Sequence, residues 1–312
     1  MAMNLIVSKN PEDHAPDAAR GINDVIRPLG DHRFIVLEPA EQIGTTELRY
    51  GTLIRVSRKT TIPQGIVEGV ELSGWITLSV LTMSSNRIQL SSNSTSSKSE
   101  LVILNGKSEM RAYFDANTDY FKLSIHESLL LPDVALGIID PRFLSVNASY
   151  VIAEHQRFAF AKMLSRLLYT RYSDLEFETL TTDLAIMMLA VLSKSRAPTP
   201  INNRRRCVKK ATELISSNSV DKITLVDLAR NCHCSLRTLD YAFTSILGVT
   251  PSHYLEMYRL NNLRQSLLQG DKKVGEAAFD LGYKHLGNLA KSYTDLFGEL
   301  PSITRAKVLP TC

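Results

Sequence analysis

The sequence predicts an α+β protein of more than one domain, with a β-rich N-terminal part and an all-α C-terminal part. The length of 312 residues corresponds to about two domains. Short β-branched runs between about residues 31 and 130 give way to apolar residues at helical spacing from about residue 148. The net charge of +4 divides into −2 for residues 1–197 and +6 for residues 198–312, so the two parts also differ in charge.

Composition excludes several classes of protein. The chain is 44% hydrophobic and 22% charged, as is ordinary for a globular protein. The four cysteines (Cys207, Cys232, Cys234 and Cys312) are too few for a disulfide framework, so we expect a reducing, cytoplasmic location. No apolar run reaches the roughly 18 residues of a membrane-spanning helix, and the first residues lack a secretory pattern. We therefore expect no membrane partner.

The N-terminal domain is predicted to cover residues 1–196. Its β-rich part, about 31–130, contains short β-branched runs separated by Gly, Asn and Ser clusters, which is typical of a β-sandwich or a cupin-like barrel. The predicted strands lie at 34–37, 53–56, 66–70, 75–81, 87–90, 101–104 and 121–125.

Two helices are predicted to follow, over residues 148–172 and 175–195 within a helical region of about 148–196. Their apolar surface is wide. This surface fits packing against the β domain, and it also fits an antiparallel helix pair that forms a dimer. Residues 197–203 contain Pro198 and Pro200 and are predicted to be a linker.

The C-terminal domain, residues 204–312, carries clear helix start and stop signals. Thr224 and Ser235 are predicted N-caps, and Pro251 suits a first helical position. Gly248 and Gly270 are predicted to end helices. The predicted helices cover residues 205–217, 225–231, 236–247, 251–268, 274–281 and 288–297.

Residues 225–243 and 274–293 repeat one pattern of helix, tight turn and helix. The aligned pairs are Ala229 with Ala278, Leu239 with Leu289, and Phe243 with Tyr293. A small alanine lets two helices cross closely, and the larger residues close the contact, as in a helix-turn-helix unit. The first turn contains His233, one of the few residue types that tolerate a positive φ, so we expect the turn to be retained.

The order of motifs over about residues 204–307 resembles the DNA-binding domain of the AraC/XylS family of transcription regulators. The matching residues are Gly248, Pro251, Tyr254, Arg259 and Leu260, then Ala278, Gly282 and Tyr283, then Phe297, Gly298, Pro301 and Ser302. Two departures are the Cys232-His233-Cys234 turn, where members often carry glycine, and Tyr283 in place of phenylalanine.

The resemblance implies a double helix-turn-helix domain in a sequence-specific transcription regulator, with activation as the expected direction. It implies double-stranded operator or promoter DNA as a partner, an effector-binding and dimerisation domain over residues 1–196, and a homodimer. RNA polymerase is a further candidate partner. The implied DNA contacts are Ser235, Arg237, Thr238, Asp240, Tyr241, His285, Leu286, Gly287, Asn288, Lys291 and Arg305.

The side-chain chemistry of these residues indicates which DNA groups they can contact. Arg237 suits a bidentate contact with guanine, and Asn288 suits adenine. Leu286 and Gly287 have no hydrogen-bonding side chain, so the second helix is expected to read DNA shape or thymine methyl groups. Residues 251–268 as a helix would span roughly 27 Å, enough to hold two recognition helices about one DNA turn apart.

Four residues of the N-terminal domain are candidate effector ligands: Arg55, Arg58, Lys59 and Ser73. Their pattern is loosely similar to the PilZ signature for cyclic di-GMP, although the arginine spacing is one residue short unless Lys59 serves, and Glu71 stands where the signature has Asp or Asn. The alternatives are an exposed edge strand protected by cations, and a sugar, amine or organic acid effector.

The basic C-terminal domain is also compatible with a second function. A non-specific or architectural nucleic-acid-binding protein would also carry a basic domain, and its binding would depend on salt with little sequence preference. Cys232-His233-Cys234 lacks the second ligand pair of a zinc site, so we expect no metal or other cofactor. The sequence contains no Gly-x-Ser-x-Gly, P-loop or dinucleotide motif, so we expect no enzyme activity.

Overall fold

The structure is a computed structural model that describes residues 6–7, 30–39, 46–62, 64–82, 88–90, 100–107, 109–145, 147–193, 203–217, 223–270, 272–283 and 286–308. Contacts divide the chain into one unit of residues 1–34 and 42–200 and a second of residues 35–41 and 201–312. The second unit therefore includes a short segment from the predicted N-terminal domain. Most of the predicted linker lies outside the described residues. No helix in the described part is long and apolar enough to cross a membrane.

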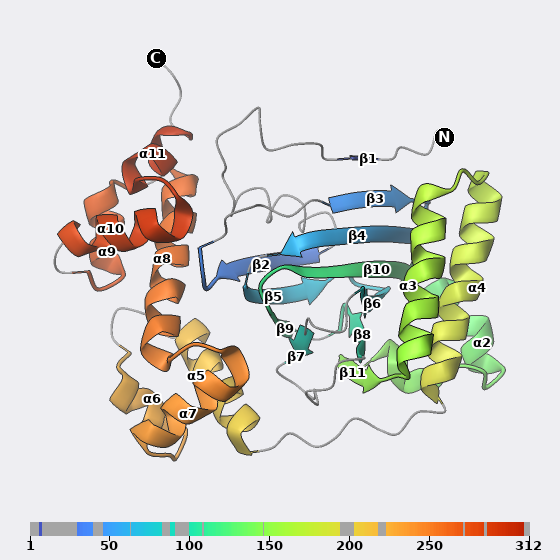
Figure 1. The fold of residues 1–312 in the computed structure, drawn as a ribbon, viewed down its shortest axis with the longest axis horizontal. Coiled ribbons are helices and arrows are strands. Elements are labelled where there is room, and N and C mark those ends of the chain that lie inside the picture. The colour runs from blue at the N-terminus through green and yellow to red at the C-terminus, as the bar shows by residue number, and fades with distance from the viewer. Residues whose placement is uncertain are drawn as a thin grey trace. The chain divides into compact units, whose positions relative to one another are not determined.

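Two antiparallel sheets form the first unit (Figure 1). The seven-stranded sheet has the order β1-β3-β4-β10-β6-β8-β11, and the four-stranded sheet has the order β2-β5-β9-β7. The strands are β1 (Ile6–Val7), β2 (Gly30–Val36), β3 (Thr46–Tyr50), β4 (Ile54–Ile62), β5 (Gly65–Glu71), β6 (Trp75–Leu81), β7 (Ile88–Leu90), β8 (Glu100–Asn105), β9 (Met110–Phe114), β10 (Thr118–His126) and β11 (Ala148–Val151).

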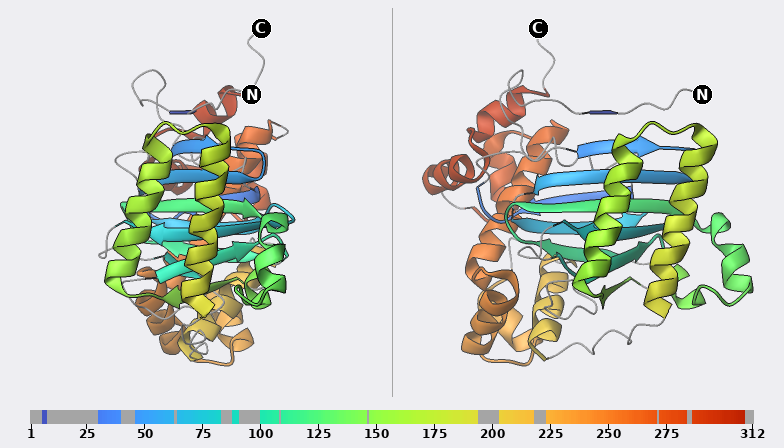
Figure 2. Two further views of the ribbon diagram at one scale, coloured as in Figure 1. Left: turned by 90° about the vertical axis from the view of Figure 1, so that its right-hand side faces the viewer. Right: turned by 45° about the vertical axis from the view of Figure 1, so that its right-hand side comes forward.

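Helices α3 (Glu154–Tyr169) and α4 (Asp174–Ser193) cover one face of the seven-stranded sheet, as the left view of Figure 2 shows. Leu164 and Leu168 recur at helical spacing on the buried side of α3, and they pack with Ile54 and Val56 of β4 in one core cluster. The short η2 (Glu127–Leu129), α2 (Leu131–Ala135) and η3 (Pro141–Leu144) connect β10 with β11.

Arg49 fixes the connection between α3 and α4 to the edge of this sheet. Its guanidinium donates to the main-chain oxygens of Leu167, Thr170 and Tyr172. It also lies 4.3 Å from the ring centroid of Phe177 on α4. These bonds satisfy carbonyl groups at the end of α3 that have no partner within the helix.

The predicted order of a β-rich part, helices and an all-α part is confirmed, whereas the closed cupin-like barrel remains a prediction. Strands β1, β3, β9 and β11 were not predicted. The helix predicted from residue 148 begins instead at Glu154, because Ala148–Val151 pairs with β8. A run of four residues is too short for periodicity to separate strand from helix, so pairing with a neighbouring strand decides.

Seven helices make up the described C-terminal unit: α5 (Asn203–Ser217), α6 (Leu225–Asn231), α7 (Leu236–Leu247), α8 (Pro251–Gln269), α9 (Val274–Asp280), α10 (Leu286–Phe297) and α11 (Pro301–Ala306). Helix α8 connects the α6–α7 pair with the α9–α10 pair (Figure 1). Its start and end agree with the predicted signals, since Pro251 occupies the first turn and Gly270 ends the helix at φ +80°.

The last residue of β2 and the residue after it are bound to α8. The side-chain amide of Asn261 accepts from the main-chain N–H of Val36 at 3.1 Å and donates to the oxygen of the same residue at 2.9 Å. The His253 ring lies 2.9 Å from the main-chain oxygen of Leu37. Asn261 thus acts like a strand partner for residues 36–37.

Candidate nucleic-acid interface

The first helix-turn-helix unit depends on one turn conformation. Between α6 and α7, the main-chain N–H of Cys234 donates to the oxygen of Ala229 at 3.0 Å. His233 adopts φ +53°, one of two positive φ values at non-glycine positions among the described residues. The expectation that histidine would take this position in the turn is confirmed.

The second unit repeats the same hydrogen bond. Between α9 and α10, the N–H of Tyr283 donates to the oxygen of Ala278 at 3.1 Å. Gly282 adopts φ +81° at the position that aligns with His233. The two turns therefore share one backbone path although their residues differ.

The residues predicted to close each unit are all buried. Ala229 is 5% exposed and Ala278 is fully buried. The larger pairs, Leu239 with Leu289 and Phe243 with Tyr293, are 0–2% exposed. Buried small residues let the two helices of each unit pack closely, so the second helix presents its outer face to solvent.

Ser235 starts the first presented helix. Its hydroxyl accepts from the main-chain N–H of Thr238 at 3.1 Å and lies 2.8 Å from the Thr238 hydroxyl, so both side chains take part in the N-cap. Arg237, Asp240 and Tyr241 are exposed on the same helix. Within the described part of the chain, the Arg237 side chain makes no hydrogen bond or ion pair, which leaves its donors available.

Tyr241 has a partner that the sequence did not indicate. It is 56% exposed, and the guanidinium carbon of Arg204 lies 4.4 Å from its ring centroid. Arg204 belongs to α5, which precedes the repeat. Stacking of a cation on an exposed aromatic ring adds positive charge beside the first presented helix.

The second presented helix carries Asn288 and Lys291, both exposed. His285 lies outside the described residues. Leu286 and Gly287 open α10, but their side chains are outside what the structure describes. Arg305 on α11 uses its Nε to donate to the main-chain oxygen of Lys272 at 2.9 Å. The structure thus places six predicted contacts, Arg237, Asp240, Tyr241, Asn288, Lys291 and Arg305, on three helices, whereas Ser235 and Thr238 form the cap.

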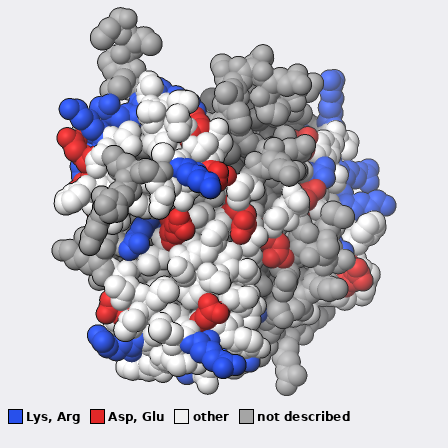
Figure 3. Space-filling view, turned by 60° about the vertical axis from the view of Figure 1, so that its left-hand side comes forward, with Lys and Arg blue, Asp and Glu red and all other residues white. Residues whose placement is uncertain are grey.

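On one face of the molecule, the positive charge of the described residues does not form a continuous area (Figure 3). On the face shown in Figure 3, Lys and Arg side chains occur in separate groups, with Asp and Glu between them. Local side chains such as Arg237 and Lys291 therefore matter more for an anion contact than the net charge of the domain.

Three cysteines pack between α5 and the first turn. The Sγ atoms of Cys207 and Cys234 lie 3.6 Å apart, and the thiol of Cys232 lies 3.5 Å from the main-chain oxygen of Cys207. Burial raises the pKa of all three thiols, that of Cys234 to about 11, so they remain protonated at neutral pH. Among the described residues, no cluster of three His, Cys, Asp or Glu side chains could hold a metal ion.

A buried arginine organises the second helix-turn-helix unit, and no local sequence pattern indicated it. Arg264 of α8 is 2% exposed and donates to Glu299 at 2.9 Å and to the hydroxyl of Tyr293 at 3.2 Å. Its guanidinium carbon also lies 4.6 Å from the ring centroid of Phe297. These contacts connect α8 with the end of α10 and the start of α11.

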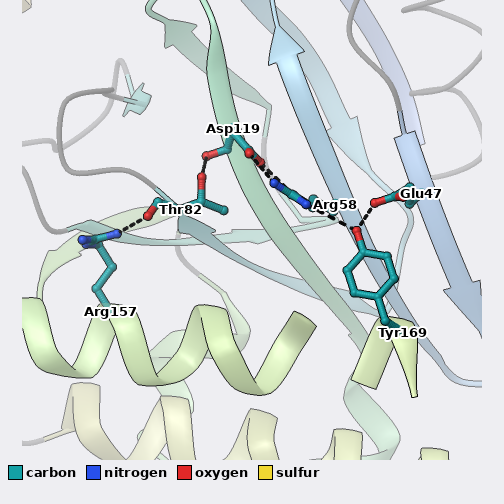
Figure 4. A network of polar contacts seen from close by, with 6 residues as sticks. All are labelled: Glu47, Arg58, Thr82, Asp119, Arg157 and Tyr169. Carbon is teal, nitrogen blue, oxygen red and sulfur yellow. Dashed lines mark hydrogen bonds and ion pairs between the residues drawn. The ribbon is translucent and has the colours of Figure 1, made fainter. Parts of the chain in front are cut away.

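The four predicted effector ligands do not converge on one site. Arg58 donates to both carboxylate oxygens of Asp119, at 3.2 and 2.7 Å, and contacts Tyr169 of α3, which in turn bonds to Glu47 (Figure 4). Lys59 is the next residue on β4 and points to the opposite face of the sheet, as strand geometry requires.

The other two effector candidates are also separate. The guanidinium carbon of Arg55 lies 4.4 Å from the ring centroid of Trp75. Ser73 is exposed in the turn between β5 and β6. Arg55 and Lys59 share one face of β4, whereas Arg58 faces the helices.

In comparisons with known proteins, the matching region lies in the part of the chain that contains the two helix-turn-helix units. A family model described as "Helix-turn-helix domain" matches residues 228–307. The XylDLEGF operon transcriptional activator 2 of Pseudomonas putida is 31% identical over 130 residues, which cover 41% of this chain and 83% of that protein. The probable thc operon regulatory protein of Rhodococcus erythropolis is 33% identical over 98 residues, which cover only 30% of each chain.

Among solved structures, a probable AraC family transcriptional regulator from Rhodopseudomonas palustris CGA009 is 31% identical over 33% of this chain and 98% of that chain, with a TM-score of 0.32. The AraC-like transcriptional activator CuxR is 13% identical over 90% of this chain and 100% of that chain, with a TM-score of 0.44.

The turn geometry predicts how substitutions affect stability. His233→Val should lower the free energy of unfolding by about 1–2 kcal/mol, because a β-branched residue is strained at positive φ. Gly282→Ala should have an effect of the same order in the second turn. His233→Asn is the matched control and should be close to neutral, because asparagine tolerates this conformation. Urea unfolding of the full chain measures all three, and equal stability of the Val and Asn variants would contradict the assigned turn.

Proposed function

Because the chain belongs to the AraC/XylS family of transcription regulators, we propose that it reads a specific site on double-stranded DNA through α7 and α10 under the control of a small effector. The observation that carries this proposal is the repeated turn, which presents Arg237 on one helix and Lys291 on another. A helix presented in this way fits the major groove, where base edges can be distinguished.

The two presented helices, α7 and α10, carry side chains that suit different contacts with DNA. Arg237 offers the planar donor pair that matches the O6 and N7 atoms of guanine. Asn288 offers the amide that matches adenine, and Lys291 suits a phosphate. Asp240 either accepts from cytosine or orients Arg237. Ser235 and Thr238 bring the N-terminus of α7, with its main-chain N–H groups, toward a phosphate.

Helix α8 sets the distance between the two reading helices. Its 19 residues span about 28 Å at about 1.5 Å per residue. This length approaches the roughly 34 Å that separates successive major-groove segments on one face of DNA. One chain can thus contact two segments of an operator. Activation of transcription, with RNA polymerase as a partner, is part of this proposal.

We expect Arg237→Ala to weaken binding to the specific site by about 1–3 kcal/mol, or about five- to 150-fold, and to relax base preference at one position. Lys291→Ala should weaken binding similarly on all sequences and reduce the salt dependence by about one phosphate contact. The site is first selected from a randomised duplex pool with the full chain, and affinities are then measured by fluorescence anisotropy at several salt concentrations.

Lys162→Ala on α3, an exposed lysine of the other unit, is the matched control and should leave DNA affinity unchanged. Unchanged affinity of the Arg237 variant at physiological salt would remove this residue from the recognition surface. Selection of no preferred sequence, together with a steep salt dependence, would favour the rival architectural function.

We also propose that the protein forms a homodimer through the outer face of α3 and α4. Phe158 and Leu175 are 65% and 76% exposed there, and Met163, Leu180 and Met187 are 40–43% exposed. Apolar side chains gathered on a helix pair favour burial against a second copy. The packing of α3 and α4 on the sheet does not compete with this role, because it uses the opposite faces of the helices.

A charge on this face should disrupt the dimer. Leu175→Glu and Phe158→Glu are each expected to weaken dimerisation at least tenfold, since a carboxylate would be buried without a partner. Leu136→Glu is the control, because Leu136 is 75% exposed but lies outside α3 and α4. Analytical ultracentrifugation over a concentration series measures the equilibrium. A monomeric wild-type chain at high micromolar concentration would reject the dimer.

Cyclic di-GMP as the effector remains a prediction that rests on the sequence pattern alone. For this ligand, Arg58 would have to leave Asp119, and Arg58 and Lys59 would have to act from opposite faces of β4. Isothermal titration of the full chain with cyclic di-GMP tests it. Binding that is lost in Arg58→Ala would support the pattern, and the absence of heat would exclude this ligand.

A further inference from the structure

Three of the four cysteines of the chain lie together where α5 meets the turn between α6 and α7. The Sγ atoms of Cys207 on α5 and Cys234 in the turn are 3.6 Å apart, although the two residues are 27 positions apart in the sequence. The thiol of Cys232 lies 3.5 Å from the main-chain oxygen of Cys207. All three are free thiols that are only partly buried, so a small reagent can reach them from solution.

The fold brings Cys207 and Cys234 close enough to react with each other. A disulfide has an S–S length of about 2.05 Å, so bond formation requires the two sulfur atoms, now 3.6 Å apart, to approach by about 1.6 Å. The cysteine content predicts a reducing compartment, where disulfides are mostly transient and redox-sensing. The pair is therefore expected to stay reduced until an oxidant acts on it.

The turn, rather than α5, is the part that can move when the sulfur atoms approach. Val208 and Ala211, which follow Cys207 on α5, are 5% and 0% exposed, and close-packed side chains resist displacement. Cys234 instead lies between two exposed residues, His233 and Ser235. Bond formation should therefore pull Cys234 toward α5.

A shift of Cys234 reaches the start of the first presented helix. The main-chain N–H of Cys234 makes the bond to Ala229 that defines the turn, and the next residue, Ser235, is the N-cap of α7. Both features set where α7 begins and hence the direction in which Arg237 points. The disulfide would thus displace a side chain that is proposed to read DNA.

A second contact between α5 and α7 restrains the helix farther along. Arg204 lies three residues before Cys207, so the two share one side of α5. The guanidinium carbon of Arg204 is 4.4 Å from the ring centroid of Tyr241 on α7. With this contact in place, movement at Cys234 should tilt α7 rather than carry the whole helix along.

We propose that Cys207 and Cys234 form a reversible disulfide with a low-molecular-weight disulfide as the oxidant, and that this bond lowers the affinity of the protein for its DNA site. The effect on DNA rests on the proposed function, whereas formation of the bond does not. The thiol pair is thus a modification site inside the first helix-turn-helix unit.

The reaction is two successive thiol–disulfide exchanges. The sulfur of one cysteine attacks a sulfur of the small disulfide, whose S–S bond breaks, and one small thiol leaves with the proton of that cysteine. The sulfur of the second cysteine then attacks the cysteine sulfur of the mixed disulfide, and the second small thiol leaves with the other proton. The protein loses two hydrogen atoms, and the oxidant is reduced to two thiols.

The surroundings of the pair affect both directions of this reaction. Burial raises the pKa of the Cys207 and Cys234 thiols, and only the thiolate is a nucleophile, so oxidation at neutral pH should be slow. Closing the bond displaces the turn, and a strained disulfide is more easily reduced. The site therefore suits a response to sustained oxidation that is reversed once thiols return.

The first test measures the bond itself. The full chain is reduced, separated from the reductant and incubated with oxidised glutathione. We expect the intact mass to fall by two hydrogen atoms, and tandem mass spectrometry of tryptic peptides to join Cys207 with Cys234. Mixed disulfides without an internal bond, or a bond between Cys232 and Cys234 instead, would overturn the proposal.

The second test measures DNA affinity by fluorescence anisotropy on the selected site. Oxidised wild-type protein should bind at least tenfold more weakly than reduced protein, and dithiothreitol should restore the affinity. Cys207→Ser should have the same affinity before and after treatment. Equal affinities of the reduced and the internally bonded wild type would overturn the effect on DNA.

Two matched controls keep the pair intact. Cys232→Ser removes the neighbouring thiol, and Cys312→Ser removes the fourth cysteine of the chain. Both variants should form the bond and lose affinity as the wild type does, and failure of either to do so would assign the response to a different pair. If Cys207→Ser does not fold, the wild type before and after reduction still decides.

The two tests separate this proposal from the proposed function. A chain that selects no DNA sequence in its reduced form would reject the proposed function, while the mass measurement would still decide the disulfide. Specific DNA binding without an internal bond after oxidation would reject the disulfide alone.

Discussion

The presented faces of the C-terminal unit depend on one backbone constraint, the positive φ between the two helices of each repeat. At His233 and Gly282 the chain turns left-handed, and this lets the next residue donate to the alanine oxygen five positions earlier. The turn determines where α7 begins, and hence that Ser235 forms its N-cap. From that starting point, helical spacing places Arg237 outward and Leu239 inward. A residue that cannot adopt this turn would therefore rotate every recognition side chain, which is a larger effect than loss of any single contact.

The rest of the unit holds these turns in place by burial rather than by surface charge. The cysteines of the first turn are protonated and pack against α5, whereas the second unit uses the buried Arg264–Glu299 pair at 2.9 Å. A buried ion pair is weak evidence for added stability, but its fixed geometry suits the positioning of helix ends. Asn261, which also belongs to α8, positions the end of β2 in a similar way, because its amide bonds to both main-chain groups of Val36. The buried polar groups of this unit thus mainly fix how its helices and the bound segment are oriented.

The sequence predicted the C-terminal helices well because their signals are local. Thr224, Ser235 and Gly248 each act within four residues of the helix end that they define. The β domain was harder to predict, since β9 becomes a strand through pairing with β5, which is distant in the sequence. Likewise, alternation along β4 separates Arg58 from Lys59, but no local signal tells which face meets the helices and which meets the second sheet. The bond between Val36 and Asn261 joins residues 225 positions apart and leaves no trace in either local pattern.

The interior charges of the sheet domain gain a physical reason if they serve a conditional partner. Apolar residues at the positions of Lys59 and Lys122 would pack the same space without the cost of desolvation, so stability alone does not account for them. A ligand can shift the protein between states only when it binds one of them better. The last residue of β2, Val36, bonds through both of its main-chain groups to Asn261 on α8.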